Sequence, residues 1–466
     1  MKVFPIFLRI PSVIFILLLS GCASLPIPIP GAGPDPYEGL SQDDRDALTL
    51  RESNMVQVQN AELESYLMNV MGKLFGHDVL VRENIRIALV ASGDPGAAIF
   101  DDGLLVWKIG TFDHLKNEDE VAAILAHEMA HLTSEHHETD MTGAFMDKIM
   151  ATGETAVIFS GAGSMAELWT AANSVRWASD SLLFPSFSRE EETEADIEAA
   201  KTLVAAGYNA DAVRTMLGRL RVFYGDQTEF VAEKMFALDS DGGNKTSDIR
   251  LTIDTDAVMR NLKGYAEAKW GKAYETFVER EAAVRMTLAR DFPKRKRGKF
   301  KTQQYQNLLA SEAVADWFKD HRVGFELARL VIEDQEDVDT FHKAAAYLEN
   351  SSLTSEVFNY DTIFKSALRN EQRDVASNMA ARLINSDNAT LEHYLIYGSY
   401  ETQLGDPQQA IAVFQIADQT FSRSQDQTIV PLILSAKDKA GIKQGTTALR
   451  CLDPTLTAAC LYREKQ

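Results

Sequence analysis

The segment His127–His137, HEMAHLTSEHH, holds four of the nine histidines in the chain. His127 and His131 are four residues apart, so one turn of a helix places both imidazoles on one face, where two nitrogens can bind one zinc ion at about 2.0 Å. Glu128 then points beside the ion, which is the position that a general base needs. Asn117 and Glu120 precede the segment in a capping-box pattern, which predicts the helix that carries these residues.

A catalytic zinc ion needs a third protein ligand, and two positions compete for this role. His137 lies six residues after His131, where metzincins have their third histidine. That arrangement uses a glycine to turn the chain, and Ser134 stands there instead. We expect the helix to continue past Ser134 and to carry His137 away from the site.

The other candidate lies in the acidic segment SREEETEADIEAA, residues 188–200. Glu192 and Asp196 are four residues apart on a predicted helix that ends at Gly207. One carboxylate can bind the metal while the other accepts the free N–H of a zinc-bound histidine and fixes its tautomer. Glu194 is the rival ligand, but it would face roughly 160° away from Asp196 on the same helix.

These motifs carry a family resemblance. The segments NAELESYLMNVMGKLF, NEDEVAAILAHEMAHLTSEH and SREEETEADIEAAKTLVAAGYNADAV resemble zinc metallopeptidases of the HtpX and BepA type, which are gluzincins. The resemblance covers about residues 40–260. It implies one Zn²⁺ per chain bound by His127, His131 and Glu192, with Glu128 as the catalytic base and Asp196 as the catalytic-site residue that orients a histidine ligand.

One position departs from the pattern of this family. Its members usually have a Thr-His-Pro segment with the histidine six residues before an arginine, whereas here Asn244 precedes Arg250 at that distance. In BepA-like proteins the loop histidine can reach the zinc site and restrain it. The residue for that restraint is missing here.

The predicted fold class is α+β. A mostly helical zincin-type peptidase domain with a small sheet is followed by an all-α domain of repeats that resemble tetratricopeptide (TPR) repeats. Alternating apolar residues predict strands at 84–92 and 103–110, and apolar spacing predicts helical structure from Ser41 to Phe75. The predicted parts are a signal peptide at 1–21, a tether at 22–40, the peptidase domain at 41–265, a helical connector at 266–350, the repeats at 351–450 and a tail at 451–466.

The repeat prediction comes from spacing in the C-terminal region. Three apolar or aromatic positions are repeated after 34 residues, the period of a tetratricopeptide repeat: Tyr360, Ile363 and Ala376 precede Tyr394, Tyr397 and Ala410. A further helix with the sequence IVPLILSAKDKAG would cap the array. An unrelated helical bundle remains the alternative.

The N-terminus predicts export and attachment to a membrane. A basic and then apolar stretch ends in LSGC, which resembles the lipobox of bacterial lipoproteins, where cleavage leaves Cys22 as a lipidated N-terminus. The alternative is a plain secretory signal followed by a chance cysteine. Ala23 resembles the sorting pattern for the outer membrane, so we expect the periplasmic side of that membrane, or the outer face of the cytoplasmic membrane in an organism with one membrane.

Charge and cysteine content limit the partners. The formal net charge is −21, and −23 once Lys2 and Arg9 leave with the signal, which argues against nucleic acid. Cys451 and Cys460 are a possible disulfide, because an exported compartment is oxidising. The lipid anchor is the expected link to the membrane, since the apolar stretch at 156–178 contains charges and predicts a buried or lid helix.

The predicted function is that of a lipid-anchored zinc metalloendopeptidase. Glu128 would assist the attack of zinc-bound water on peptide bonds of exported polypeptides, with misfolded or assembling envelope proteins as substrates. The substrate would extend along an edge strand, either GLLVWKIG (103–110) or GAAIFDD (96–102). Outer-membrane or envelope proteins are possible partners of the repeats.

Two alternatives stay open. The first is an assembly factor or chaperone that acts through its repeats, with a structural or restrained zinc site. The second is a metal-dependent hydrolase of cell-wall amide bonds.

Overall fold

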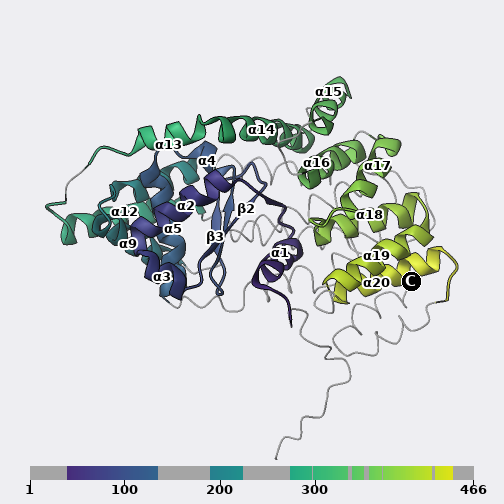
Figure 1. Ribbon diagram of the computed structural model, residues 1–466, viewed down its shortest axis with the longest axis horizontal. Coiled ribbons are helices and arrows are strands. Elements are labelled where there is room, and N and C mark those ends of the chain that lie inside the picture. Colours follow the sequence, from purple (N-terminus) through teal and green to yellow (C-terminus); the bar gives the residue numbers. More distant parts are fainter. Residues whose placement is uncertain are drawn as a thin grey trace, which may run out of the picture. The chain divides into compact units, whose positions relative to one another are not determined.

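The structure of the chain is a computed structural model that describes residues 39–134, 189–223, 273–295, 298–333, 338–350, 356–369, 371–421 and 426–443. Its described part is mostly helical, with one small sheet (Figure 1). This confirms the predicted combination of helices and a small sheet.

The sheet has four strands in the order β1-β2-β4-β3. Strands β2 and β4 are parallel neighbours, so the two predicted strands do lie side by side, and the other two pairs are antiparallel. Every residue of β4 is buried. The strand lies between β2 and β3, and helices cover the sheet there. The strands are β1 (Gln57–Val58), β2 (Arg86–Val90), β3 (Ala97–Ile99) and β4 (Leu104–Lys108).

The region predicted to be helical from Ser41 to Phe75 is two helices with a strand between them. α1 (Gln42–Glu52) and α2 (Ala61–Phe75) are separated by Asn54, whose φ of 57° interrupts the helical path, and by β1, which pairs with β2. The prediction is therefore wrong for residues 53–60, because tertiary pairing decides so short a strand. The apolar face of α2 packs in the core, with four residues at 0% exposure: Leu63, Leu67, Val70 and Met71.

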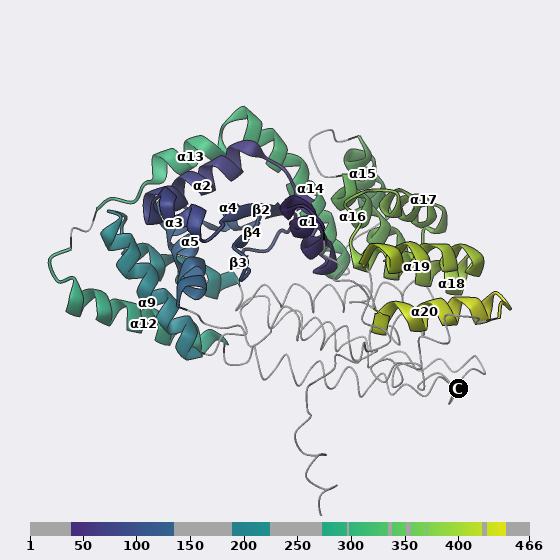
Figure 2. The same cartoon turned by 60° about the horizontal axis from the view of Figure 1, so that its bottom comes forward.

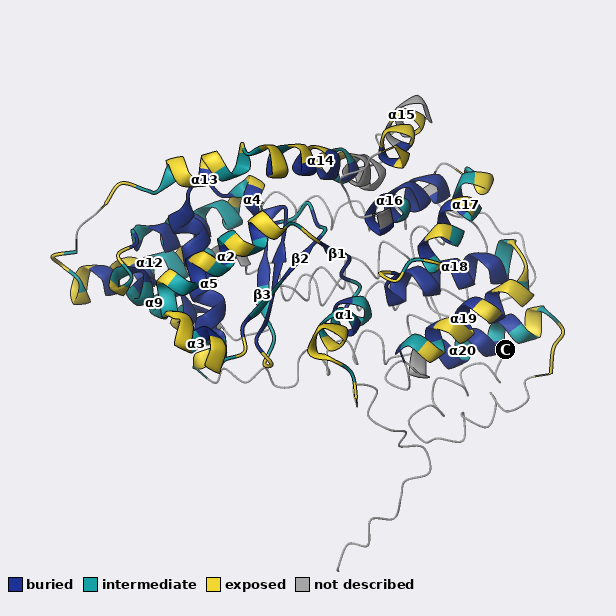
Figure 3. Ribbon diagram, in the orientation of Figure 1, coloured by how far each residue is buried: buried dark blue, intermediate teal, exposed yellow. Residues whose placement is uncertain are grey.

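Helix α5 (Glu118–Thr133) is the centre of this part of the molecule. It is buried from Glu118 to His131 (Figure 3), and the side chain of Asn117 caps its N-terminus by accepting a hydrogen bond from Glu120 N. Two short helices complete this region: α3 (His77–Arg82), which packs on α2, and α4 (Thr111–His114), which precedes α5 in the sequence.

Three consecutive buried acids anchor the first turn of α5. Each contacts two partners, and negative charge at this end also suits the helix dipole. The anchoring contacts are Glu118 with Lys73 Nζ and Tyr208 Oη, Asp119 with the backbone N–H groups of Asn209 and Lys301, and Glu120 with Arg219 Nε and the backbone N–H of Lys116.

Further helices complete the core. α9 (Arg189–Ala205) packs along α5, and α12 (Ala273–Asp291) packs along α9 (Figure 2). α13 (Thr302–Leu309) contacts α5, and α14 (Glu312–Glu333) contacts α2. The predicted connector thus contributes side chains to the same core as the predicted peptidase domain: Val284, Leu288, Tyr305, Val314, Trp317 and Phe318.

The C-terminal helices pack in the order of the sequence, α16 on α17, α18 on α19 and α19 on α20. A side chain on Gly398 would overlap the ring of Phe414, so α18 and α19 approach closely there. The likeness to tetratricopeptide repeats stays a prediction. The helices are α15 (Val338–Glu349), α16 (Glu356–Arg369), α17 (Arg373–Ile384), α18 (Leu391–Leu404), α19 (Pro407–Phe421) and α20 (Asp426–Lys439).

Several predicted features concern residues outside the described part of the chain. Within the described ranges, no helix is both long enough and apolar enough to cross a membrane. The features that lie outside are Cys22 with its signal and tether, the helix at 156–178, the loop with Asn244 and Arg250, His137, and the pair Cys451 and Cys460.

A buried ion cluster joins α16 to α18 and generates a prediction. Lys365 Nζ lies 3.1 Å from Asp361 Oδ1 and 2.9 Å from Glu392 Oε1, and all three side chains are at most 7% exposed. Lys365→Met leaves two buried carboxylates without this cation, so we expect the free energy of unfolding to fall by about 3–5 kcal/mol in denaturant titrations. Arg382→Met is the control, since its pair with Glu349 is exposed and is worth about 1 kcal/mol or less. Equal losses in both variants would contradict the prediction.

His321 of α14 generates a second prediction. It is 0% exposed and lies among the rings of Trp317, Phe325 and Phe358, and burial lowers its pKa from 6.5 to about 4. The unfolded chain therefore binds a proton that the folded chain excludes between these two values. Stability should fall as the pH falls from 6.5 to 4, by up to about 3 kcal/mol from this residue. Urea midpoints measured across this range should fall less in His321→Leu than in the unmodified chain, and parallel curves would count against the assignment.

Candidate metal centre

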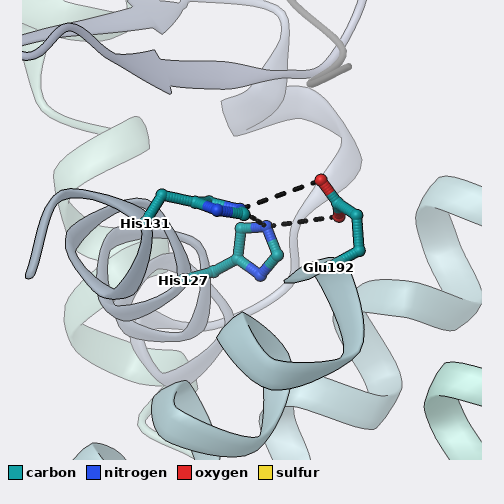
Figure 4. Close-up of side chains that lie close together, drawn as sticks. All are labelled: His127, His131 and Glu192. Carbon is teal, nitrogen blue, oxygen red and sulfur yellow. Dashed lines mark hydrogen bonds and ion pairs between the residues drawn. The ribbon is translucent and has the colours of Figure 1, made fainter. Parts of the chain in front are cut away.

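Three side chains converge where α5 meets α9. The Nε2 atoms of His127 and His131 are 3.1 Å apart, Glu192 Oε2 lies 3.6 Å from His127 Nε2, and Glu192 Oε1 lies 3.8 Å from His131 Nε2. Figure 4 shows both imidazoles projecting from one helix toward the carboxylate on the other. Each residue offers one ligand atom, and these atoms all lie within 4.8 Å of one another.

The local sequence explains why these side chains meet. The spacing of four residues places His127 and His131 on one face of α5, and Glu192 lies in the first turn of α9, which packs against that face. All three residues are nearly buried, at 6%, 3% and 9% exposure. The two helices therefore hold the ligand atoms within a packed, largely buried interface.

The structure describes two of the three candidates for the third ligand, Glu192 and Glu194, but not His137. Glu194 is exposed on α9 and is not part of the cluster, so among the described carboxylates of this segment the structure favours Glu192. The expectation that the first helix continues past Ser134 is wrong, because α5 ends at Thr133 and Ser134 caps it with a hydrogen bond from its N–H to Ala130 O. His137 lies beyond the described residues, so its role as a ligand is not tested.

The donor set fits a zinc ion. Two ligand atoms that are each about 2.0 Å from a tetrahedral ion lie about 3.3 Å apart. The histidine nitrogens are 3.1 Å apart, and each lies within 3.8 Å of one of the two oxygens of Glu192. Glu192 Oε1 is buried and accepts no hydrogen bond from any described residue, although it faces His131. A buried carboxylate oxygen without a donor is costly, and a bound cation would satisfy it.

Asp196 supports His127 from behind. His127 Nδ1 lies 2.9 Å from Asp196 Oδ1, within hydrogen-bond distance, and Asp196 is 0% exposed. A carboxylate at this distance favours the tautomer with the proton on Nδ1, which leaves Nε2 free to face the cluster. Burial raises the pKa of Asp196, but the positive charge of Arg280 and the bond to His127 outweigh it and bring the pKa to about 2.

Burial and the neighbouring charges also shift the pKa values of His127 and Glu192. Burial lowers the pKa of His127, yet the bond to Asp196 and the nearby negative charges raise it overall. Burial also raises the pKa of Glu192, and this effect exceeds the opposing influence of Arg280 and His127. The shift of His127 thus reflects the carboxylates around it, whereas the shift of Glu192 reflects its burial.

Glu128 is the next residue after His127 and is 6% exposed. Its negative charge acts on both His127 and Arg280, so its carboxylate lies close to the cluster. It is not one of the three residues whose ligand atoms group together. Its position beside the potential ligands is the one that the sequence predicted for a base.

Sequence reasoning missed Arg280. Its side chain reaches from α12 to both Glu192 and Asp196, and it is 12% exposed. No spacing rule connects an arginine in α12 with a carboxylate in α9, and the predicted peptidase domain ended before this residue. A buried arginine on an otherwise amphipathic helix carried no distinct signal in the sequence.

Comparison with known proteins adds to this geometry. Residues 69–274 match the family described as Peptidase family M48. A Vibrio cholerae protein named as a candidate beta-barrel assembly-enhancing protease is 26% identical over 179 residues, which are 37% of this chain and 36% of that protein. The beta-barrel assembly-enhancing protease of Escherichia coli K12 is 24% identical over 162 residues, 34% of this chain and 32% of that protein, and the Shigella flexneri protein gives the same values.

The match is partial in both directions. The chain aligns with about a third of the length of the curated relatives it matches. The region matched to the family contains α5 and α9 with all three clustered residues, and it ends just inside α12. Residues 69–274 are therefore similar to the peptidases of family M48, and the chain is also similar to the beta-barrel assembly-enhancing proteases.

Proposed function

We propose that the protein is a lipid-anchored, zinc-dependent endopeptidase that hydrolyses peptide bonds of exported polypeptides. The observation that carries this proposal is the convergence of His127, His131 and Glu192 on one point, with Glu128 beside it. A peptidase family domain covers these residues, which supports peptide-bond hydrolysis as the reaction.

The residues of the chain have distinct roles in this proposal. His127, His131 and Glu192 would hold the ion, and Asp196 would keep His127 in the tautomer that presents Nε2. Zn²⁺ is a Lewis acid that polarises a carbonyl and lowers the pKa of water to about 7. Glu128 would take a proton from the attacking water and return it to the leaving amine, as a general base and then a general acid.

Strand β3 is the proposed binding edge for the substrate. Of the two segments predicted as edge strands, 103–110 contains β4, which lies between β2 and β3, so it is excluded as an edge. The segment 96–102 contains β3, which is the last strand of the sheet among the described residues and packs beside α5. An extended peptide could therefore add to β3 next to the helix that carries both histidines.

The register of β3 identifies the backbone groups that would bind. Backbone bonds join Lys108 N to Gly96 O and Phe100 N to Leu104 O. In an antiparallel ladder, bonded pairs alternate with non-bonded pairs, so the intervening odd residues direct their N–H and C=O groups away from β4. These residues are Ala97 and Ile99.

The setting of the enzyme is also part of the proposal. Relatives named as beta-barrel assembly-enhancing proteases support substrates or partners among assembling envelope proteins. The LSGC motif supports attachment through Cys22 on the periplasmic side of the outer membrane. Helices α16–α20, with their 34-residue spacing, would form TPR-like repeats that bind a partner or substrate.

Replacement of Glu128 tests the reaction. Glu128→Gln keeps the size of the side chain but cannot accept a proton, so cleavage of an unfolded exported protein should fall by about 10²- to 10⁴-fold. Zinc content should stay at that of the unmodified chain, because Glu128 is not a proposed ligand. Glu194→Gln, an exposed acid on α9, should cleave normally.

Removal of zinc with a chelator should abolish cleavage, and added zinc should restore it. If the unmodified chain binds zinc but cleaves no protein, the assembly-factor alternative is favoured. Cleavage of peptidoglycan alone would favour the cell-wall hydrolase.

A proline on the edge strand tests the substrate position. Ile99→Pro removes an N–H that would bond the substrate, and proline is tolerated on edge strands, so KM for an unfolded polypeptide should rise several-fold while zinc content is unchanged. Ile99→Val keeps the N–H and serves as the control. Identical KM values in these two variants would exclude β3 as the binding edge.

A further inference from the structure

Arg280 contacts both Glu192, a potential ligand of the candidate metal centre, and Asp196, which lies behind it. Its Nε lies 2.6 Å from Asp196 Oδ2 and its Nη2 lies 3.1 Å from Asp196 Oδ1, which is a two-pronged contact, while Nη1 lies 2.9 Å from Glu192 Oε2. Three of its nitrogens are therefore used on two residues of α9. Only a planar guanidinium offers donors in this arrangement.

These contacts fix the orientation of the atoms that face the cluster. Asp196 Oδ1 is shared between Arg280 and His127, so the arginine, the aspartate and the histidine form one chain of contacts. Glu192 is held through Oε2, which leaves its Oε1 directed at His131 without a donor among the described residues. Arg280 thus occupies the outer oxygens and leaves an inner one for an ion.

The negative charges around the candidate metal centre favour a cation at the place of Arg280. Glu128, Glu192 and Asp196 bring up to three negative charges into a buried space, where like charges repel strongly. One guanidinium and one divalent ion together match three carboxylates. Without Arg280, the two carboxylates of α9 would repel each other and turn away from the positions that the histidines need.

The location of Arg280 in the chain makes this contribution unexpected. It lies on α12, after the end of the region matched to the peptidase family at residue 274. Arg250, the arginine that follows Asn244 in the family pattern, lies outside the described residues. The metal centre of this chain is therefore completed by a helix beyond the matched region.

We propose that Arg280 is a positioning residue that orients Glu192 and, through Asp196, His127 for metal binding. The inference rests on the proposed function, because it assumes that these residues bind zinc. It predicts that metal affinity depends on the forked contacts of Arg280 and not merely on the docking of α12 against its neighbours.

Metal affinity of full-length variants tests the proposal. In competition with a chromogenic chelator, Arg280→Gln should bind Zn²⁺ about 10- to 100-fold more weakly than the unmodified chain, the usual effect of losing a group that orients metal ligands. The absorption spectrum of the Co²⁺-loaded variant should also change, because the ligand geometry relaxes. Arg280→Lys keeps the charge but lacks the fork, so it should recover only a small part of the affinity.

A neighbouring ion pair supplies the matched control. Glu281 lies next to Arg280 on α12 and binds Arg214 at 2.8 Å, so Glu281→Gln weakens the docking of the helix but leaves Glu192 and Asp196 untouched. Its zinc affinity and Co²⁺ spectrum should match those of the unmodified chain. A loss equal to that of Arg280→Gln would show that docking alone matters and would overturn the proposal.

Other outcomes would separate this inference from the proposed function. Failure of the unmodified chain to bind zinc would remove the proposed function itself. Normal zinc binding by the unmodified chain, together with equal or tighter binding by Arg280→Gln, would overturn only the role of Arg280, as would full recovery of affinity in Arg280→Lys. Circular dichroism shows whether each variant is folded, and Arg280→Lys keeps the test valid if the glutamine variant is not.

Discussion

The burial of opposite charges between α5 and α9 is the constraint on which the site depends. Glu192 and Asp196 lie one helical turn apart and face two imidazoles across the interface, away from water. Buried carboxylates are costly unless each finds a partner. Their partners are His127 and Arg280. The contacts that offset the cost of burying these carboxylates therefore also orient the potential ligand atoms.

Helix α5 can carry this site because it is held firmly at its other end. Its first turn is anchored by three buried acids that bind residues of other segments, and every residue from Val121 to His131 is buried. A helix immersed in a core has little freedom to rotate or shift. The two histidines therefore present their nitrogens from a rigid support, which is the arrangement that metal binding requires.

The core that carries the candidate metal centre extends beyond the segment that the family comparison matches. Helices α12, α13 and α14 share one core with α2, α5 and the sheet, and the backbone of Lys301 bonds the first turn of α5. A chain that ended near residue 265 would lose these contacts together with Arg280. We infer that the helices after the matched region stabilise the site as well as link it to the C-terminal helices.

The sequence by itself determined the local features of the site. Helical spacing predicted the shared face of His127 and His131, the capping residue Asn117, and the pairing of Glu192 with Asp196, because these relations depend only on the geometry of one helix. Only the tertiary structure decided the strand order that leaves β3 at the edge, the strand that divides residues 41–75, and the reach of Arg280 to α9. These features join residues far apart in the chain, and such contacts follow from the packing of whole elements rather than from any periodicity within one of them.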